Sequence, residues 1–325
     1  MTTPSLQYIP ENNINVVEKS KTRSGWLVQV ETTSRCNGKC VFCPYQGSWS
    51  SRHPGEMSDA LYEKTIRNIA DLGGMLDRFC PYLTNEPFLD SKILDRIRLG
   101  WKLLKPECVE IATNASVLTP ALAERLAETL QNIKHEIWIS FHGINREMYE
   151  SIMGLPFDKT LANVINLLKL AESRNLKIVL RGNGFSRYAT KEHPYYFERT
   201  DYRNFWERVA RDNNIESQFD VKFIPYHDRA GNLRHKQDYD YHVHRNSLKG
   251  AYCWRVDKAL HITWDGLVVI CCNDVNREVV YGNIANQPLK DILLGTACTK
   301  AKKMAFGAID SPTQFICKRC AWPGG

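Results

Sequence analysis

Between about residues 25 and 226, the chain alternates two patterns of hydrophobic and polar positions. Short runs rich in β-branched and aromatic residues predict six strands: Trp26–Thr32, Leu76–Leu83, Val109–Thr113, Glu136–Phe141, Lys177–Arg181 and Asp220–Pro225. Between them, apolar residues recur at spacings of three and four, which predicts helices over Met57–Leu72, Ser91–Leu104, Pro120–Gln131, Phe157–Ser173 and Tyr202–Asn213. Ser58 and Asp90 stand at N-cap positions. This alternation predicts a parallel α/β sheet with crossover helices, either barrel-like or doubly wound.

The pattern changes after residue 230, where a polar stretch without periodicity predicts a connecting loop. Beyond it, Ala259–Trp264 and Leu267–Ile270 flank the turn dipeptide Asp265-Gly266 and predict a hairpin. Leu289–Leu294 and Cys298–Ala305 predict short helices. We divide the chain into an N-terminal extension (residues 1–24), an α/β unit (25–230), a linker (231–250) and a small C-terminal α+β domain (251–325).

Composition narrows the class of protein. The chain has 325 residues, 43% of them hydrophobic and 24% charged, which is enough to bury a globular core. Apolar runs are too short for a transmembrane helix, and the N-terminus lacks a secretory signal pattern, so we expect a cytoplasmic protein without membrane association. The net charge of +7 is spread along the chain, so we expect no nucleic-acid partner.

Cysteine usage is the unusual feature. The chain has eleven cysteines, and seven of them fall into two tight patterns near its two ends. A secreted disulfide framework is usually shorter and follows a signal peptide. In a reducing compartment, clustered thiols indicate metal ligands or catalytic groups.

The first pattern is CxxxCxxC, formed by Cys36, Cys40 and Cys43 directly after the first predicted strand. Three thiolates on one tight loop can bind three irons of a cubane cluster and leave the fourth iron open to a small molecule. A structural zinc site normally needs four protein ligands, so a zinc loop would require a distant fourth. The alternative is a structural zinc loop or buried thiols without function.

With Phe42 before the last cysteine, this motif resembles that of the radical S-adenosylmethionine (SAM) enzymes. The resemblance implies a partial (β/α)6 barrel in which Cys36, Cys40 and Cys43 hold a [4Fe–4S] cluster whose open iron binds SAM. Reduction would cleave SAM to a 5′-deoxyadenosyl radical that abstracts hydrogen from a substrate. It also implies a flavodoxin- or ferredoxin-type reductant as partner.

The resemblance also suggests residues that contact SAM. The family's Gly-Gly-Glu-Pro segment is matched only in its second half, at Thr84-Asn85-Glu86-Pro87. The cofactor-binding candidates at the strand ends are Asn85, Glu86, Asn114, Ser140, His142, Arg181 and Asn183. Glu86 is equally explained as a negative charge at a helix N-terminus. A polar residue at a strand end is also commonly a turn former.

The second cysteine pattern joins Cys253, Cys271, Cys317 and Cys320, with seventeen, forty-five and two residues between successive members. Four thiolates at this spacing suit either zinc or a cluster. Together with the Trp264-Asp265-Gly266 turn, the pattern resembles the shortened SPASM ("twitch") extension of radical SAM enzymes, which holds one auxiliary [4Fe–4S] cluster. That resemblance favours Cys271 over Cys272 as ligand and implies two clusters in all.

Twitch enzymes include a dehydrogenase and an epimerase of aminocyclitol or aminoglycoside substrates. We therefore expect oxidation, or epimerisation, of a small polyol-type substrate. Epimerisation needs a free thiol, for which Cys272 and Cys298 are the catalytic candidates, although a free cysteine is more often inert and buried. The alternatives are a maturase of ribosomal peptides, which would usually carry a leader-binding domain before the first strand, and a two-cluster electron carrier.

Overall fold

The computed structural model describes residues 25–184, 197–216, 218–225, 228–233 and 244–321. Within this part of the chain, nine strands form one sheet in the order β6-β5-β4-β3-β2-β1-β7-β8-β9. The six predicted strands are all present as β1 (Trp26–Val30), β2 (Leu76–Cys80), β3 (Cys108–Thr113), β4 (His135–Ser140), β5 (Ile178–Gly184) and β6 (Phe219–Pro225). Neighbours among them pair in parallel, so the partial α/β barrel expected from the sequence is confirmed.

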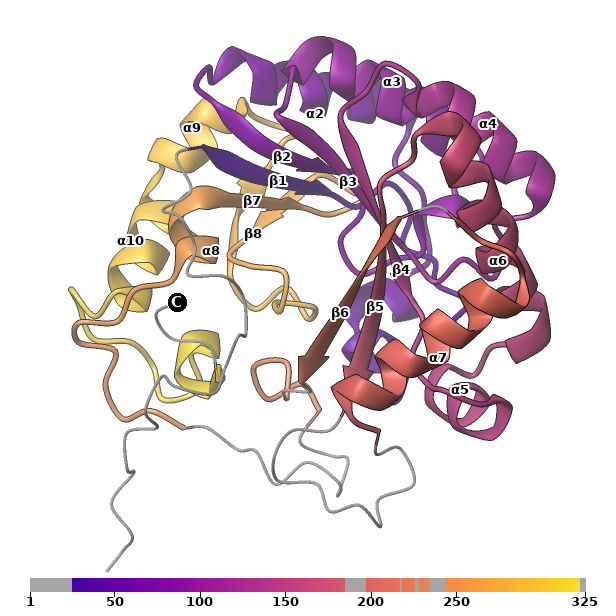
Figure 1. The fold of residues 1–325 in the computed structure, drawn as a ribbon. Helices are drawn as coiled ribbons and strands as arrows, with labels where there is room; N and C mark the ends of the chain where they lie inside the picture. The colour runs from indigo at the N-terminus through magenta and orange to yellow at the C-terminus, as the bar shows by residue number, and fades with distance from the viewer. Residues whose placement is uncertain (1–24, 185–196, 217, 226–227, 234–243, 322–325) are drawn as a thin grey trace, which may run out of the picture.

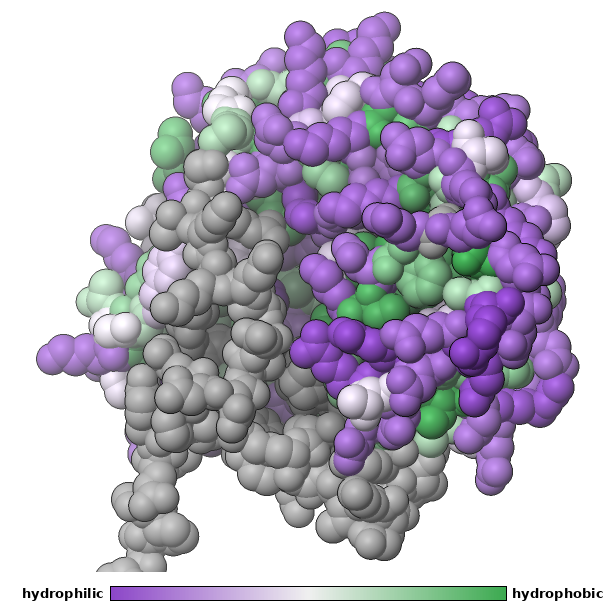
Figure 2. Space-filling model, viewed as in Figure 1, coloured by the Kyte–Doolittle hydropathy of each residue, from purple (hydrophilic) through white to green (hydrophobic). Residues whose placement is uncertain are grey.

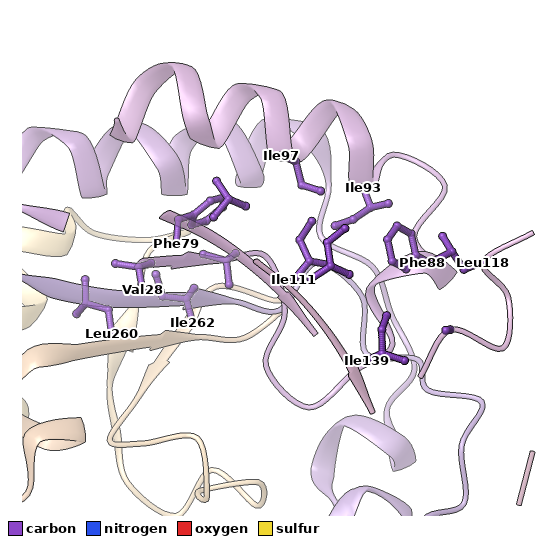
Figure 3. Close-up of a cluster of buried hydrophobic side chains, with 14 of the residues drawn as sticks. Val28, Phe79, Phe88, Ile93, Ile97, Ile111, Leu118, Ile139, Leu260 and Ile262 are labelled. Atoms are coloured by element: carbon purple, nitrogen blue, oxygen red, sulfur yellow. The ribbon is translucent and has the colours of Figure 1, made fainter. Parts of the chain in front are cut away.

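Helices cover the outer face of this sheet as an arc (Figure 1). They are α2 (Asp59–Asp71), α3 (Ile93–Leu104), α4 (Pro120–Leu130), α6 (Phe157–Arg174) and α7 (Arg199–Asp212). Outward-facing Ile111 packs beneath Ile93 and Ile97 of α3, and Phe79 and Val28 belong to the same buried cluster (Figure 3). Because strand side chains alternate between faces, the residues next to these in sequence point into the barrel.

The C-terminal domain continues the barrel's sheet. Its predicted hairpin is confirmed as β7 (Ala259–Ile262) and β8 (Leu267–Val269), and β9 (Val280–Asn283) adds a third strand. β7 pairs in parallel with β1, so the two units share one sheet. Three helices, α8 (Trp254–Lys258), α9 (Leu289–Leu294) and α10 (Thr296–Ala305), complete the domain. Parts of the expected extension and linker, residues 1–24 and 234–243, lie outside the described residues.

Several short elements were not expected from the sequence. They are α8 and β9 of the C-terminal domain, α1 (Trp49–Arg52), α5 (Arg146–Met153) and the 3-10 turns η2 (Pro44–Gly47), η3 (Pro87–Leu89) and η4 (Ile316–Arg319). Ser58 caps α2 as predicted, by accepting from the amide of Leu61 at 3.2 Å. Asp90 is not the N-cap of α3, which is Lys92; its carboxylate accepts from the amide of Lys92 at 2.9 Å and pairs with Arg96 at 3.1 Å.

The helices present mostly hydrophilic residues on the face shown in Figure 2. Among the described residues, the structure contains no helix that is long and apolar enough to cross a membrane.

Candidate functional site

Cys36, Cys40 and Cys43 lie on the loop that follows β1. This loop is at the edge of the sheet formed by the C-terminal ends of the parallel strands. The amide of Cys36 donates to the hydroxyl of Tyr45 at 2.9 Å, and the amide of Cys43 donates to the carbonyl of Cys40 at 3.0 Å. Gln46 donates from its side chain to the carbonyl of Gly38 at 3.1 Å. Hydrogen bonds within the segment thus fix the loop that carries the three thiols.

The glycine between the first two cysteines lies next to both of their sulfurs. A Cβ built on Gly38 would lie 3.4 Å from the sulfur of Cys40 and 3.8 Å from that of Cys36, so this residue stands within contact distance of both sulfurs. Burial, and then the nearby Glu86 carboxylate, raises the pKa of Cys36 to about 12. Across the described part of the chain, no three His, Cys, Asp or Glu side chains converge closely enough to hold a single metal ion. Three cysteines on one loop suit an iron–sulfur cluster, in which each cysteine binds a different iron.

Glu86 is buried at the end of β2, and its carboxylate already accepts three hydrogen bonds. The donors are the Thr113 hydroxyl at 2.6 Å and the amides of Asn114 at 2.7 Å and Phe88 at 3.2 Å. Burial raises the pKa of Glu86 to about 7 although these donors oppose the shift. The side chain therefore caps η3 and joins the ends of β2 and β3. The amide of Glu86 donates to the carbonyl of Arg35 at 2.9 Å, which ties this segment to the cysteine loop.

Asn85 and Asn114 lie beside this network. Asn114 donates from its side chain to the Asn37 side-chain oxygen at 2.9 Å and accepts from the amide of Ser116 at 2.9 Å. The side-chain oxygen of Asn85 accepts from the amide of Leu83 at 2.9 Å. Its buried Nδ2 has no hydrogen-bond partner among the described residues, so it can still donate to a bound molecule.

Ser140, His142, Arg181 and Asn183 meet at the ends of β4 and β5. Arg181 donates to the Ser140 hydroxyl at 2.7 Å, and the amide of Asn183 donates to Nδ1 of His142 at 2.9 Å. Burial, and then the charges of Arg181 and Arg229, hold the pKa of His142 well below its usual range, so the imidazole is neutral. Within the described structure, Nε of Arg181 and Oδ1 of Asn183 are buried without a partner. Both are free to bind a polar ligand.

His142 also connects these strand ends to the cysteine loop. Its ring meets the Phe42 ring edge-on, with 4.7 Å between the ring centroids. All seven SAM-contact candidates therefore lie at one end of the barrel.

Glu31, which is fully buried directly after β1, was not predicted from the sequence. Its carboxylate accepts from the hydroxyls of Thr84 at 2.8 Å and Ser50 at 3.2 Å, and from the amide of Trp264 at 3.4 Å. Glu31 thus joins the barrel to the Trp264-Asp265-Gly266 turn of the C-terminal domain. A carboxylate directly after a buried strand was the available sequence signal.

A charged network on the inner face of the barrel was also missed. Arg78 donates to Glu110 at 2.6 Å and to Glu136 at 2.7 Å, and Lys177 donates to Glu136 at 2.6 Å. The hydroxyl of Tyr82 donates to the second oxygen of Glu110. Arg78, Glu110 and Glu136 are largely buried and give the inside of the barrel a polar, hydrogen-bonding surface, whereas Lys177 is mostly exposed just before β5.

Replacing Glu136 by glutamine tests this network through its pH dependence. Burial opposes ionisation, but hydrogen bonds from Arg78 and Lys177 outweigh it and lower the pKa of Glu136 to about 2, from 4.5. The ionised carboxylate therefore stabilises the fold above about pH 4.5 and loses this contribution as the pH falls toward about 2. We expect Glu136→Gln to lower the free energy of unfolding at pH 7 by about 1–2 kcal/mol, allowing for solvent screening.

Urea unfolding of cluster-free protein at pH 7 and at about pH 3 measures this effect, which should shrink at the lower pH. Glu107→Gln is the control, because Glu107 and Lys134 form an exposed pair at 3.7 Å. Such a pair contributes about 0–1 kcal/mol. A deficit in Glu136→Gln that is equal at both pH values would contradict the assignment.

The second group of cysteines surrounds one pocket in the C-terminal domain. Cys253, Cys271, Cys317 and Cys320 all line it, together with apolar residues such as Val256 and Ile316. Burial, and then the neighbouring thiols, raise the pKa of Cys271 and of Cys317. Four thiols around an apolar pocket fit a cluster whose irons all have protein ligands.

Cys272 and Cys298 do not line this pocket. Cys272 is half-buried in the turn after β8, whereas Cys298 is fully buried in α10 within the hydrophobic core. The placement of Cys298 does not support a hydrogen-donating role.

Comparison with protein families gives two matches. Residues 30–186 match the model described as the radical SAM superfamily. Residues 253–321 match SPASM, described as an iron–sulfur cluster-binding domain. The comparison with curated proteins found no match.

Among solved structures, the chain is similar to BtrN in complex with AdoMet (SAM) and 2-DOIA, with TM-score 0.53 and 18% identity over 91% of this chain and 93% of that one. It is also similar to anSMEcpe with bound AdoMet, with TM-score 0.52 and 16% identity over 84% and 82%. SuiB of Streptococcus suis, bound to the precursor peptide SuiA, gives TM-score 0.58 and 15% identity over 91% and 71%. At these sequence identities, the similarity shows a shared fold and nothing about the reaction.

Proposed function

We propose that this chain, which belongs to the radical SAM superfamily and carries a C-terminal SPASM domain, oxidises a small polyhydroxylated substrate. The family's domains bind SAM with a [4Fe–4S] cluster and an auxiliary iron–sulfur cluster. The observation that carries the proposal is the set of four thiols around the C-terminal pocket. With every iron ligated by protein, that cluster would be suited to accept an electron from the substrate and not to bind it.

The chain's own residues have distinct parts in holding the cofactor. Cys36, Cys40 and Cys43 would bind three irons and leave one for SAM, which supplies a 5′-deoxyadenosyl radical when bound and reduced. The Arg181 guanidinium, oriented by Ser140, would bind the carboxylate of SAM, because a charge-assisted hydrogen bond is strongest to an anion. The Glu86 carboxylate is occupied by three donors, so carbonyl oxygens beside it would accept from the SAM ammonium.

The inner face of the barrel would bind the substrate. Arg78, Glu110 and Glu136 already pair with one another, so they present oriented donors and acceptors to hydroxyl or amino groups. Tyr82 donates to Glu110, which leaves the lone pairs of its oxygen able to accept a substrate hydroxyl. A proton leaving that hydroxyl could pass to the tyrosine oxygen while the tyrosine proton moves to Glu110.

The experiment is an anaerobic incubation of reconstituted, reduced protein with SAM in deuterated water. The substrates are 2-DOIA, which is the compound bound to BtrN, and a panel of aminocyclitols and amino sugars. We expect 5′-deoxyadenosine together with a ketone product, and the unreacted substrate that is recovered should carry no solvent deuterium at the reacting carbon. Cys272→Ala should leave the product yield unchanged within about twofold, because Cys272 does not line the pocket of the second cluster.

Two results would contradict oxidation of a small substrate. Solvent deuterium in an unoxidised product, lost in Cys272→Ala, would indicate epimerisation with Cys272 as the hydrogen donor. Turnover of peptides but of no compound in the panel would indicate a peptide-modifying enzyme.

A further inference from the structure

The last turn of α5 lies directly against the loop that carries the three N-terminal cysteines. The amide of Lys39 donates to the carbonyl of Met153 at 2.8 Å, and the amide of Val41 donates to the carbonyl of Ile152 at 2.9 Å. The last carbonyls of a helix have no partner within the helix. Here two of them are satisfied by the residues on either side of Cys40.

The position of Cys40 is further fixed by a side chain of the same turn. Its sulfur lies 3.5 Å from the thioether sulfur of Met153, which is fully buried. By contrast, the amide of Cys36 is held by Tyr45 and that of Cys43 by the carbonyl of Cys40. The position of Cys40 therefore depends on α5, and that of Cys43 depends on Cys40.

α5 is itself firmly attached to the barrel. Tyr149 is fully buried, and its ring lies 4.2 Å from the ring of Phe141 at the end of β4. The helix begins at the cap Asn145, whose side chain accepts from the amide of Met148 at 2.8 Å. The helix can therefore transmit the position of β4 to the cysteine loop.

Gly154 makes this close contact possible. It ends α5 in the left-handed region, with φ 64° and ψ 29°, and its amide donates to the carbonyl of Glu150 at 2.8 Å. A Cβ at this position would lie 2.8 Å from the Cβ of Lys39, closer than real side chains approach, and 3.6 Å from its Cα. Because the Cβ of Lys39 is fixed to the backbone, the loop would have to move to relieve the contact.

We propose that the last turn of α5, capped by Gly154, positions Cys40 for binding the SAM-binding cluster. Gly154 is a positioning residue that acts through Lys39. This inference depends on the cluster that the family binds and not on the proposed reaction, so it stands or fails separately from the choice of substrate.

The test is the iron content of Gly154→Ala after anaerobic reconstitution with iron and sulfide. Two [4Fe–4S] clusters give about eight irons per chain, and we expect about four in the variant because only the auxiliary cluster forms. The reduced wild type should change its EPR spectrum on addition of SAM, whereas the variant should show only a signal that SAM does not alter. Retention of the auxiliary cluster shows that the variant has folded.

Three further variants separate the contact from backbone strain. Gly73 also has a positive φ, of 66°, so Gly73→Ala introduces the same backbone strain. Its Cβ would meet nothing within 4 Å, so we expect full iron content. Lys39→Gly in the Gly154→Ala background removes the colliding Cβ and should restore about eight irons. Lys39→Ala in that background keeps the Cβ and should not restore them. Full iron content in Gly154→Ala, an equal loss in Gly73→Ala, or rescue by Lys39→Ala would overturn the proposal.

Discussion

Replacing Cys36, Cys40 and Cys43 together by alanine should abolish formation of 5′-deoxyadenosine from SAM. Even the outer-shell partners of a metal site contribute about 10- to 100-fold to affinity or activity, so loss of all three ligands should cost well over about a hundredfold. The iron content should fall from about eight to about four per chain. Anaerobic reconstitution, iron analysis and chromatographic assay of 5′-deoxyadenosine measure both effects.

Cys80 and Cys108 provide the matched control for this experiment. Both are buried in strands of the barrel, and neither lies on the cysteine loop. The double variant Cys80→Ala/Cys108→Ala should keep full iron content and SAM cleavage. SAM cleavage by the triple variant at the wild-type rate would contradict the assignment of the loop.

The second large effect is expected from Cys317→Ala/Cys320→Ala. These cysteines line the C-terminal pocket with Cys253 and Cys271, so their loss should remove the auxiliary cluster. SAM cleavage should continue, because the cysteine loop after β1 is intact. Oxidised product should fall by more than about a hundredfold, because the substrate radical loses its electron acceptor. The ratio of product to 5′-deoxyadenosine is the measurement.

Cys272→Ala is the control for this pair, because Cys272 is adjacent to Cys271 but does not line the pocket. It should retain both the second cluster and the product ratio. An unchanged product ratio in Cys317→Ala/Cys320→Ala would show that the auxiliary cluster takes no part in the oxidation.

Local patterns predicted much of this fold. The six parallel strands, five helices of the barrel and the C-terminal helices α9 and α10 follow from periodicity, since each element has its own hydrophobic pattern. α5 was missed because it is only eight residues long and is followed almost at once by α6. The pairing of β7 with β1 was also missed. It joins residues far apart in the sequence, and no local pattern specifies which strand edge a hairpin will extend.

The residues of the candidate site also fall into a group that the sequence predicts and a group that it does not. The cysteines could be identified because ligand spacing within a loop is a local property. The bonds of Glu86 to Thr113 and Asn114 could not, because they depend on which strands are neighbours. The same holds for Arg78, which meets Glu110 and Glu136 only because β2, β3 and β4 lie side by side.

One iron at the cysteine loop should lack a protein ligand and bind SAM. The most direct measurement is electron–nuclear double resonance on reduced Cys317→Ala/Cys320→Ala, using SAM isotopically labelled in its amino nitrogen and carboxylate oxygens. We predict hyperfine coupling of both labels to the single remaining cluster. Absence of coupling in protein that holds this cluster, or zinc in place of iron after anaerobic preparation, would contradict the account.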